Sequence, residues 1–145
     1  MLGALTDAET DDVLRRQHIG RLGVAGENAV YIFPVAYGYR GTYVYFVSHE
    51  GLKVQLMRSH PHGCFQVDEI VSPAEWRSVM LHGTFEELSE EQDRDEGMSA
   101  IVEQEDSHAP PSFAPYVDGP DAMVVYRLNI EERTGRFERS QALAL

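Results

Sequence analysis

The sequence predicts a mainly β fold of the α+β class, an antiparallel barrel or sandwich of about six or seven strands with two or three helices. Three observations support this prediction. The strand-like segments are short and closely spaced, hairpin-type turns join several of them, and the helix-like segments do not alternate with them as in βαβ units. A chain of 145 residues has the size of one domain, so residues 1–145 are expected to form a single unit.

The first half of the chain is expected to begin with a helix over residues 6–18, because Thr6 and Glu9 have the spacing of a capping box. Three segments rich in β-branched and aromatic residues then predict strands, with turns at 26–28 and 38–41 between them: 20–25, 29–37 and 42–48. Pro34 cannot donate a hydrogen bond to a neighbouring strand. Its strand is therefore expected at an edge of the sheet or at a bulge.

The second half opens with a helix, in which Leu52, Leu56 and Met57 form an apolar stripe that Pro61 ends. Strands are expected over 63–69, 76–88, 122–130 and 135–138, with Gly83 as a bulge in the second of them. A second capping box, from Ser89 to Gln92, predicts a helix that continues to about residue 105. Residues 108–121 carry four prolines and are expected to form a loop.

The charge of the chain argues against several classes of partner. The formal net charge is −12, and residues 86–106 hold ten acids and one base, which is typical of a solvated helix face. No stripe of Lys and Arg is present, so nucleic-acid binding is disfavoured. No apolar run reaches the ~18 residues of a membrane span, and the first residues lack the pattern of a signal peptide. The single cysteine, Cys64, fits a protein of the reducing cytoplasm.

Two short segments could bind ligands. Ser48-His49-Glu-Gly-Leu-Lys53 joins a strand to a helix, where free N–H groups, a hydroxyl and a cation could hold a phosphate; the alternative is a simple helix start with one exposed lysine. Trp76-Arg77-Ser78 could provide a stacking platform with anion donors. The alternative is an aromatic residue at a sheet rim, with Arg77 pointing away from the face that Trp76 and Ser78 share.

Other chemistries have less support. His60, His62 and Cys64 would share one face of a strand, but their spacing matches no common zinc pattern, so loop histidines and a core cysteine are favoured and no metal site is predicted. His82 is interpreted as an ordinary strand residue. A serine-hydrolase elbow is absent, and no pair of carboxylates suggests acid–base catalysis.

The order of these segments resembles the pyridoxamine 5′-phosphate oxidase-like superfamily of FMN-binding split β-barrels, nearest its nitroimidazole-resistance-type branch. The resemblance covers about residues 12–137 and is carried by the strings IGRLGV, FPVAYGY, YFVSHEGLK, FQVDE, WRSVMLHGTFEEL and YRLNIEERTGR. It implies a split barrel that forms a homodimer, with FMN in a groove shared by the two subunits. By position, it implies these cofactor contacts: Pro34, Val35, Ala36, Ser48, His49, Lys53 and Gln66, with Trp76, Arg77 and Ser78 from the other subunit.

The resemblance implies an FMN-dependent oxidoreductase that acts on a small aromatic or nitro compound, with no catalytic side chain assigned. Oxidation of vitamin B6 is disfavoured, because the tail lacks the Arg-x-His element of the true oxidases. The branch often carries a histidine in the strand before the phosphate turn, whereas His49 here lies nearer the turn. Two alternatives stay open: a non-enzymatic flavin- or haem-binding protein of the same barrel, and a deazaflavin-dependent reductase, which the net charge of −12 disfavours.

Overall fold

The structure, a computed structural model, describes residues 1–106 and 123–140. Its helices are α1 (Asp7–Arg16), α2 (Leu52–Ser59) and α3 (Glu91–Asp106). Its strands are β1 (Leu2–Ala4), β2 (Ile19–Ala25), β3 (Val30–Ala36), β4 (Gly38–Tyr39), β5 (Tyr43–Ser48), β6 (His62–Ser72), β7 (Glu75–Leu88) and β8 (Val124–Glu138). The loop expected over 108–121 lies outside the described residues.

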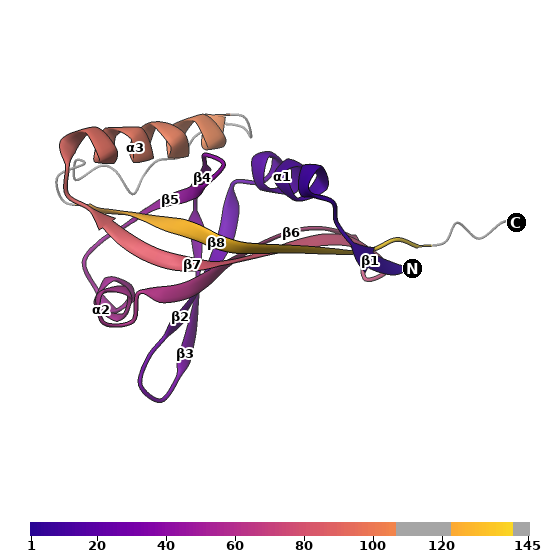
Figure 1. The fold of residues 1–145 in the computed structure, drawn as a ribbon, viewed down its shortest axis with the longest axis horizontal. Coiled ribbons are helices and arrows are strands. Elements are labelled where there is room, and N and C mark those ends of the chain that lie inside the picture. Colours follow the sequence, from indigo (N-terminus) through magenta and orange to yellow (C-terminus); the bar gives the residue numbers. More distant parts are fainter. Residues whose placement is uncertain (107–122, 141–145) are drawn as a thin grey trace, which may run out of the picture.

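One antiparallel sheet runs in the order β3-β2-β6-β7-β8-β5-β4, and β1 pairs with the end of β8. The sheet curls into a half-barrel, crossed by the long strands β7 and β8, from which the β2–β3 hairpin projects (Figure 1). The helices α1 and α3 lie on one side of these strands, and α2 lies on the other. A curled antiparallel sheet, with seven strands in its main order and β1 added at β8, and three helices in the described residues confirm the predicted split barrel.

Strand alternation separates a buried face from an open one. Leu22, Phe65 and Leu81 point inward and have no exposed surface, and the rings of Phe46 and Tyr126 stack in the same core with centroids 5.8 Å apart. The alternate residues of β3, β2, β6, β7 and β8 point the other way, and we call that side the outer face. Among the described residues, no helix is long and apolar enough to cross a bilayer.

The predicted elements are confirmed at the level of type, with differences in detail that include the unexpected strand β1. Pro34 does lie in an end strand, since β3 pairs only with β2. The expected turn at 38–41 contains the short strand β4, and the two strands expected at 122–130 and 135–138 form the continuous β8. Helix α3 buries Ile101, whereas the neighbouring Val102 is 39% exposed, because the helix turns Gly97 and Ala100 toward the sheet.

The bulge expected at Gly83 occurs on the neighbouring strand. His82 pairs with Glu132 and Gly83 pairs with Ile130, so the extra residue, Glu131, belongs to β8. A Cβ atom on residue 83 would lie 1.9 Å from the backbone oxygen of Asn129. Gly83 therefore permits the close approach of β8 beside the bulge, rather than forming the bulge itself.

Candidate functional site

Six of the ten predicted cofactor residues line one open cavity of about 210 Å³, which we call the Lys53 pocket. Strand β3 supplies one wall, β5 and the turn after it supply the opposite wall, and α2 supplies the lysine. The lining residues are Pro34, Val35, Ala36, Val47, Ser48, His49, Lys53 and Met123. Two of these residues, Val47 and Met123, carry no signal in the sequence that marks them as part of a site. In particular, nothing in the sequence shows that the segment at the start of β8, where Met123 lies, reaches this pocket.

The β3 wall offers a backbone surface for a ligand. Because β3 ends the strand order and pairs only with β2, alternate N–H and C=O groups along its other edge lack a strand partner. Across the pocket, the Ser48 hydroxyl donates to the neighbouring carbonyl oxygen of His49 at 3.0 Å. This local hydrogen bond can be exchanged for one to a ligand without disturbing the sheet.

Lys53 is a cation without a counter-charge in the part of the chain that the structure describes. Its ammonium lies 5.3 Å from the centroid of the Phe33 ring, and no carboxylate of the described residues is within ion-pair distance of it. Partial burial lowers the pKa of Lys53. A desolvated and unpaired ammonium favours an anionic ligand, because the ligand replaces the lost hydration.

A cluster of ion pairs that no sequence pattern indicated includes Glu50, the acid that directly follows His49 of the pocket. The guanidinium of Arg58 lies 2.6 Å from Glu50 and 2.8 Å from Glu87, and the hydroxyl of Tyr126 donates to Glu87 at 3.0 Å. The hydrogen bond from Arg58 lowers the pKa of Glu87, and both carboxylates raise the pKa of Arg58. Glu50 follows His49 directly, so its pairing with Arg58 reduces the negative charge beside the pocket.

The remaining predicted residues lie elsewhere on the sheet. Trp76 and Ser78 line a separate groove of about 320 Å³ on the outer face, which we call the Trp76 groove; its other lining residues are Met80, Thr134 and Arg136. Gln66, one strand away, donates its amide to Ser78 at 3.0 Å and to Asp68 at 2.9 Å. Within one chain, the predicted site therefore forms two groups of residues.

Arg77 joins neither group. It points away from the face that Ser78 occupies, as strand alternation requires, and its guanidinium binds Asp12 of α1 at 3.0 Å and also Glu69 of β6. Both carboxylates raise the pKa of Arg77. These contacts join α1 to the sheet, so within one chain Arg77 has a structural role, and its contact with a cofactor stays a prediction.

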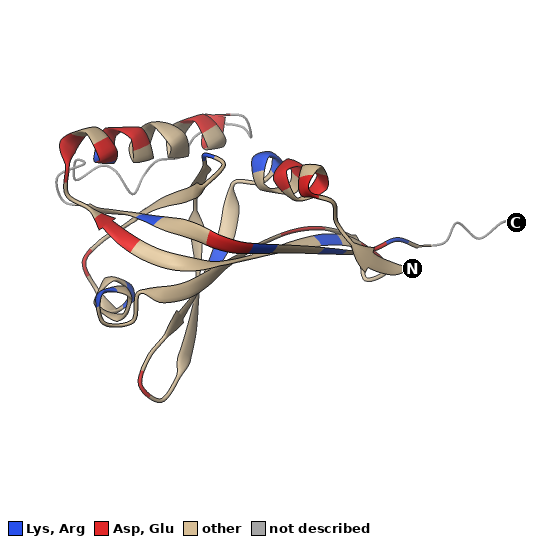
Figure 2. Ribbon diagram, viewed as in Figure 1, with Lys and Arg blue, Asp and Glu red and all other residues tan. Residues whose placement is uncertain are grey.

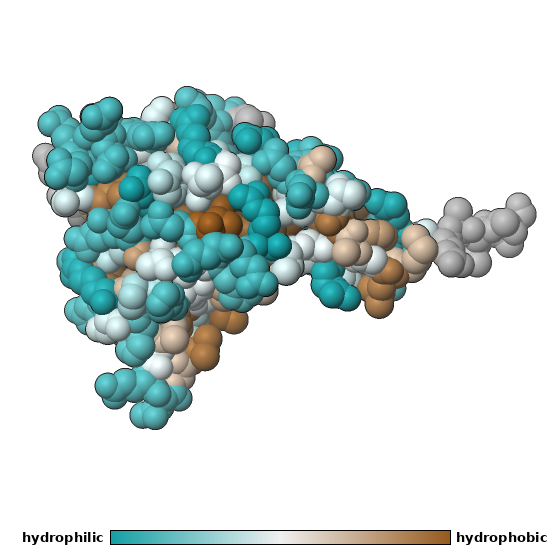
Figure 3. Space-filling view, in the orientation of Figure 1, coloured by the Kyte–Doolittle hydropathy of each residue, from teal (hydrophilic) through white to brown (hydrophobic). Residues whose placement is uncertain are grey.

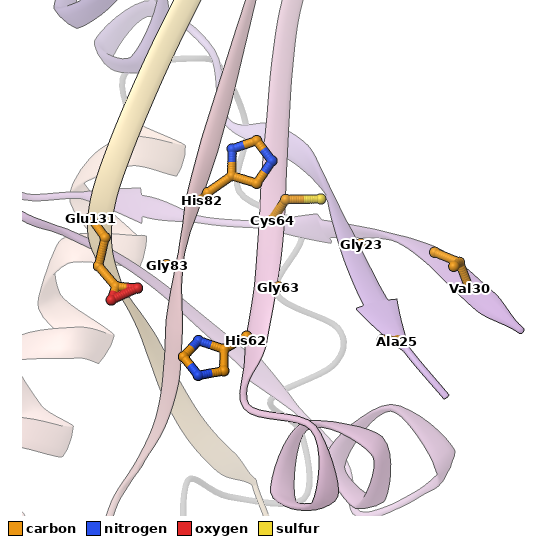
Figure 4. Close-up of a pocket in the computed structure, with 9 residues that line it drawn as sticks. All are labelled: Gly23, Ala25, Val30, His62, Gly63, Cys64, His82, Gly83 and Glu131. Atoms are coloured by element: carbon orange, nitrogen blue, oxygen red, sulfur yellow. The ribbon is translucent and has the colours of Figure 1, made fainter. Parts of the chain in front are cut away.

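The outer face carries His62, Cys64 and His82, whereas His60 lies apart from them. His60 follows the last residue of α2, so it does not share a strand with His62 and Cys64 as expected. A cavity of about 360 Å³ is lined by His62, Cys64, His82 and Glu131, whose side chains do not converge on one point (Figure 4). Within residues 1–106 and 123–140, no cluster of His, Cys, Asp and Glu has the geometry to hold a metal ion.

The acidic helix α3 does not line the Lys53 pocket. Asp and Glu residues are concentrated on α3 (Figure 2), and no residue of α3 lines the pocket. Helix α3 instead packs on β4 and β5, where Ile101 and Ala100 contact Tyr45 and Val125 in a second apolar cluster. The acidic segment 86–106, most of which is α3, therefore contributes no residue to the lining of the pocket.

Comparisons with known proteins agree with this architecture. The sequence model of the family described as pyridoxamine 5′-phosphate oxidase matches residues 6–137. A crystal structure of a FAD-binding protein from Mesorhizobium loti is 30% identical, with a TM-score of 0.75 over 94% of this chain and 98% of that chain. An uncharacterized protein of Rhizobium meliloti is 27% identical over 88% of this chain and 89% of its own length.

A fold of the same kind occurs in a more distant structure. A proposed 5-nitroimidazole antibiotic resistance protein from Bacteroides thetaiotaomicron is 14% identical, with a TM-score of 0.77 over 94% of this chain and 87% of that chain. At this identity the likeness shows the fold alone. The family match spans the half-barrel and both groups of predicted site residues, and the chain therefore belongs to the pyridoxamine 5′-phosphate oxidase family.

Proposed function

We propose that this protein binds FMN and is an oxidoreductase that acts on a small aromatic or nitro compound. The observation that carries the proposal is the Lys53 pocket, where a partly buried ammonium without an acidic partner among the described residues faces a wall of apolar and backbone atoms. Flavin cofactors need this combination, because they join an extended apolar ring system to an anionic phosphate.

The residues of the pocket fit FMN by their chemistry. Lys53 would bind the phosphate as a point charge, and the Ser48 hydroxyl would donate a second hydrogen bond to it. Pro34, Val35 and Ala36 would lie along the ring, with backbone groups of the end strand available to its polar edge. When bound, FMN supplies hydride or electron transfer at its N5 atom. The protein residues bind and orient it and exclude water.

The relatives support a flavin. The Mesorhizobium loti protein is a FAD-binding protein, and its 30% identity extends over nearly the whole of both chains. We propose FMN rather than FAD for this chain, because Lys53 is the one cation that lines the pocket and FMN carries a single phosphate.

We propose further that the protein acts as a homodimer. A cavity of about 210 Å³ is smaller than the roughly 300–1,000 Å³ of a typical small-molecule site, so one chain covers only part of a flavin. The outer face also exposes Val30 and Ile32, by 76% and 69%, on the β2–β3 hairpin, where Figure 3 shows hydrophobic side chains in brown. In the homodimer that we propose, the second copy covers this hairpin and contributes its Trp76 groove to the flavin site.

Two measurements test the proposal. The visible spectrum of the purified protein should show the two flavin bands, and FMN should bind the apoprotein with a stoichiometry of about one per chain. A Soret band would indicate haem, and a protein that is colourless and does not bind FMN would refute the proposal.

Light scattering at micromolar concentration should give twice the 16.3 kDa of one chain. Ile32→Glu should yield a monomer with weakened FMN binding, because a carboxylate would be buried without a partner. The control Val102→Glu, on the far side of the fold, should remain dimeric. A wild-type monomer that retains FMN would show that the second copy is not needed.

A further inference from the structure

The Trp76 groove contains a second cation that has no partner within the part of the chain that the structure describes. Among the described residues, Arg136 and Lys53 are the two basic side chains for which the structure records neither an ion pair nor a hydrogen bond to a side chain or backbone. Arg136 pairs directly across β7 and β8 with Ser78, so both side chains leave the sheet on the same face. The position and the free charge of Arg136 are independent of the Lys53 pocket.

The other residues of the groove supply a flat apolar surface and hydroxyl groups. Every second residue of β7 from Trp76 through Ser78 to Met80 lies on the same face, and Thr134 lies opposite Met80 on β8. Ser78 accepts a hydrogen bond from the amide of Gln66 at 3.0 Å, so its own hydroxyl proton is free to be donated. The indole and the thioether suit a planar ring, and the hydroxyl groups and Arg136 suit an anion.

Two acids, Asp68 and Glu138, leave the sheet on this face near the groove, and neither of them lines it. Asp68 pairs with Ser78 across β6 and β7, and its carboxylate accepts a hydrogen bond from Gln66 at 2.9 Å and lies 3.6 Å from the guanidinium of Arg21. Glu138 pairs with Trp76 across β7 and β8 but does not line the groove, so among the described residues Arg136 is the one charged side chain that lines it. One guanidinium balances one negative charge, and its two parallel N–H groups match the two oxygens of a carboxylate.

We infer that the Trp76 groove binds a single-ring aromatic carboxylate, with the ring on Trp76 and the carboxylate on Arg136 and Ser78. A volume of about 320 Å³ is at the lower end of small-molecule sites and accommodates one ring with a short substituent. The inference rests on the proposed function only in making this carboxylate the substrate of the flavin. It narrows the substrate from any small aromatic or nitro compound to one that is anionic.

The chain offers a specific reporter, because Trp76 is its only tryptophan. The single indole N–H signal in a nitrogen–proton correlation spectrum of the FMN-saturated protein can be followed while benzoate, 4-nitrobenzoate or the neutral isostere benzamide is added. Benzoate and 4-nitrobenzoate should shift this signal and bind at least about tenfold more tightly than benzamide. Arg136→Gln should reduce this preference to about twofold or less and leave benzamide binding unchanged.

A matched control and further outcomes decide the inference. Arg40→Gln removes an arginine that pairs with Glu103, far from the groove, and should retain the full preference for benzoate. Equal binding of benzoate and benzamide to the wild type would overturn the inference. So would phenyl phosphate binding tenfold more tightly than benzoate, because the groove would then be built for a dianion.

The Arg136→Gln variant also separates this inference from the flavin proposal. If it loses FMN affinity and the wild type does not bind benzoate, the groove serves the flavin alone and the inference is wrong. If the protein proves not to bind FMN, the same titration on the protein as purified still decides whether the groove binds aromatic carboxylates. A benzoate shift that Arg136→Gln abolishes would then support the groove without the flavin.

Discussion

Replacing Lys53 by alanine should weaken FMN binding far more than it weakens the fold. Lys53 has no ion pair among the described residues, and its one recorded contact is the cation–π contact with Phe33 at 5.3 Å. Such a contact contributes about 0.5–1 kcal/mol at an exposed site, and burial of the ammonium offsets part of it. The free energy of unfolding should therefore fall by less than about 1 kcal/mol.

The expected loss of FMN affinity is larger. A charge-assisted hydrogen bond to a phosphate contributes about 1.5–3 kcal/mol, which corresponds to about tenfold to a hundredfold in the dissociation constant. Riboflavin has the same ring without the phosphate, so its affinity should change by less than twofold. Lys53→Arg keeps the charge and should retain most of the FMN affinity, and Arg40→Ala is the control for a lost surface cation.

The assay is a titration of the apoprotein with each flavin, followed by the quenching of flavin fluorescence. The preference for FMN over riboflavin should also decline as the pH rises, because the neutral amine no longer attracts the phosphate. This decline should begin below the pKa of 10.5 of an ordinary lysine, because burial lowers the pKa of Lys53. An unchanged FMN affinity in Lys53→Ala, or an equal loss for FMN and riboflavin, would refute the assignment of Lys53 to the phosphate.

Three further predictions follow from the packing. Gln104 is buried and donates its amide to three carbonyl oxygens at the end of α1, so Gln104→Leu should lower the free energy of unfolding by about 1–3 kcal/mol in a denaturant titration. Gly83→Ala should lower the free energy of unfolding by about 1–3 kcal/mol or more in the same titration, because the new Cβ atom would meet the backbone oxygen of Asn129. A free energy of unfolding within about 0.5 kcal/mol of wild type would show that β8 can move away. The acids at the start of α3 are Glu90, Glu91, Asp93 and Asp95. Replacing them together by Gln and Asn should leave FMN affinity within about threefold at physiological salt, where the Debye length is about 8 Å. A tenfold change in FMN affinity would place the helix at the site.

Several features could be predicted because they depend on residues close together in the chain. The capping box of Thr6 and Glu9 forms as predicted and begins α1 at the next residue, Asp7. Pro34 lies in an end strand because it has no N–H group for a second neighbour. Lys53 is the only lysine in the chain, and its place after a strand and a glycine made it the candidate for an anion. These signals are local, so they could be recognised without the fold.

The tertiary structure decided which strands are neighbours and in what register. The cation in the Trp76 groove is Arg136 rather than Arg77, because β8 pairs with β7 so that Arg136 faces Ser78. Arg58 reaches Glu50 and Glu87 only because α2 packs beside β7, and nothing in their spacing along the chain indicates this contact. A shift of one residue in strand pairing would move the strand residues Arg136 and Glu87 to the opposite face of the sheet. Long-range pairing thus determined both groups of the site, which local sequence patterns do not encode.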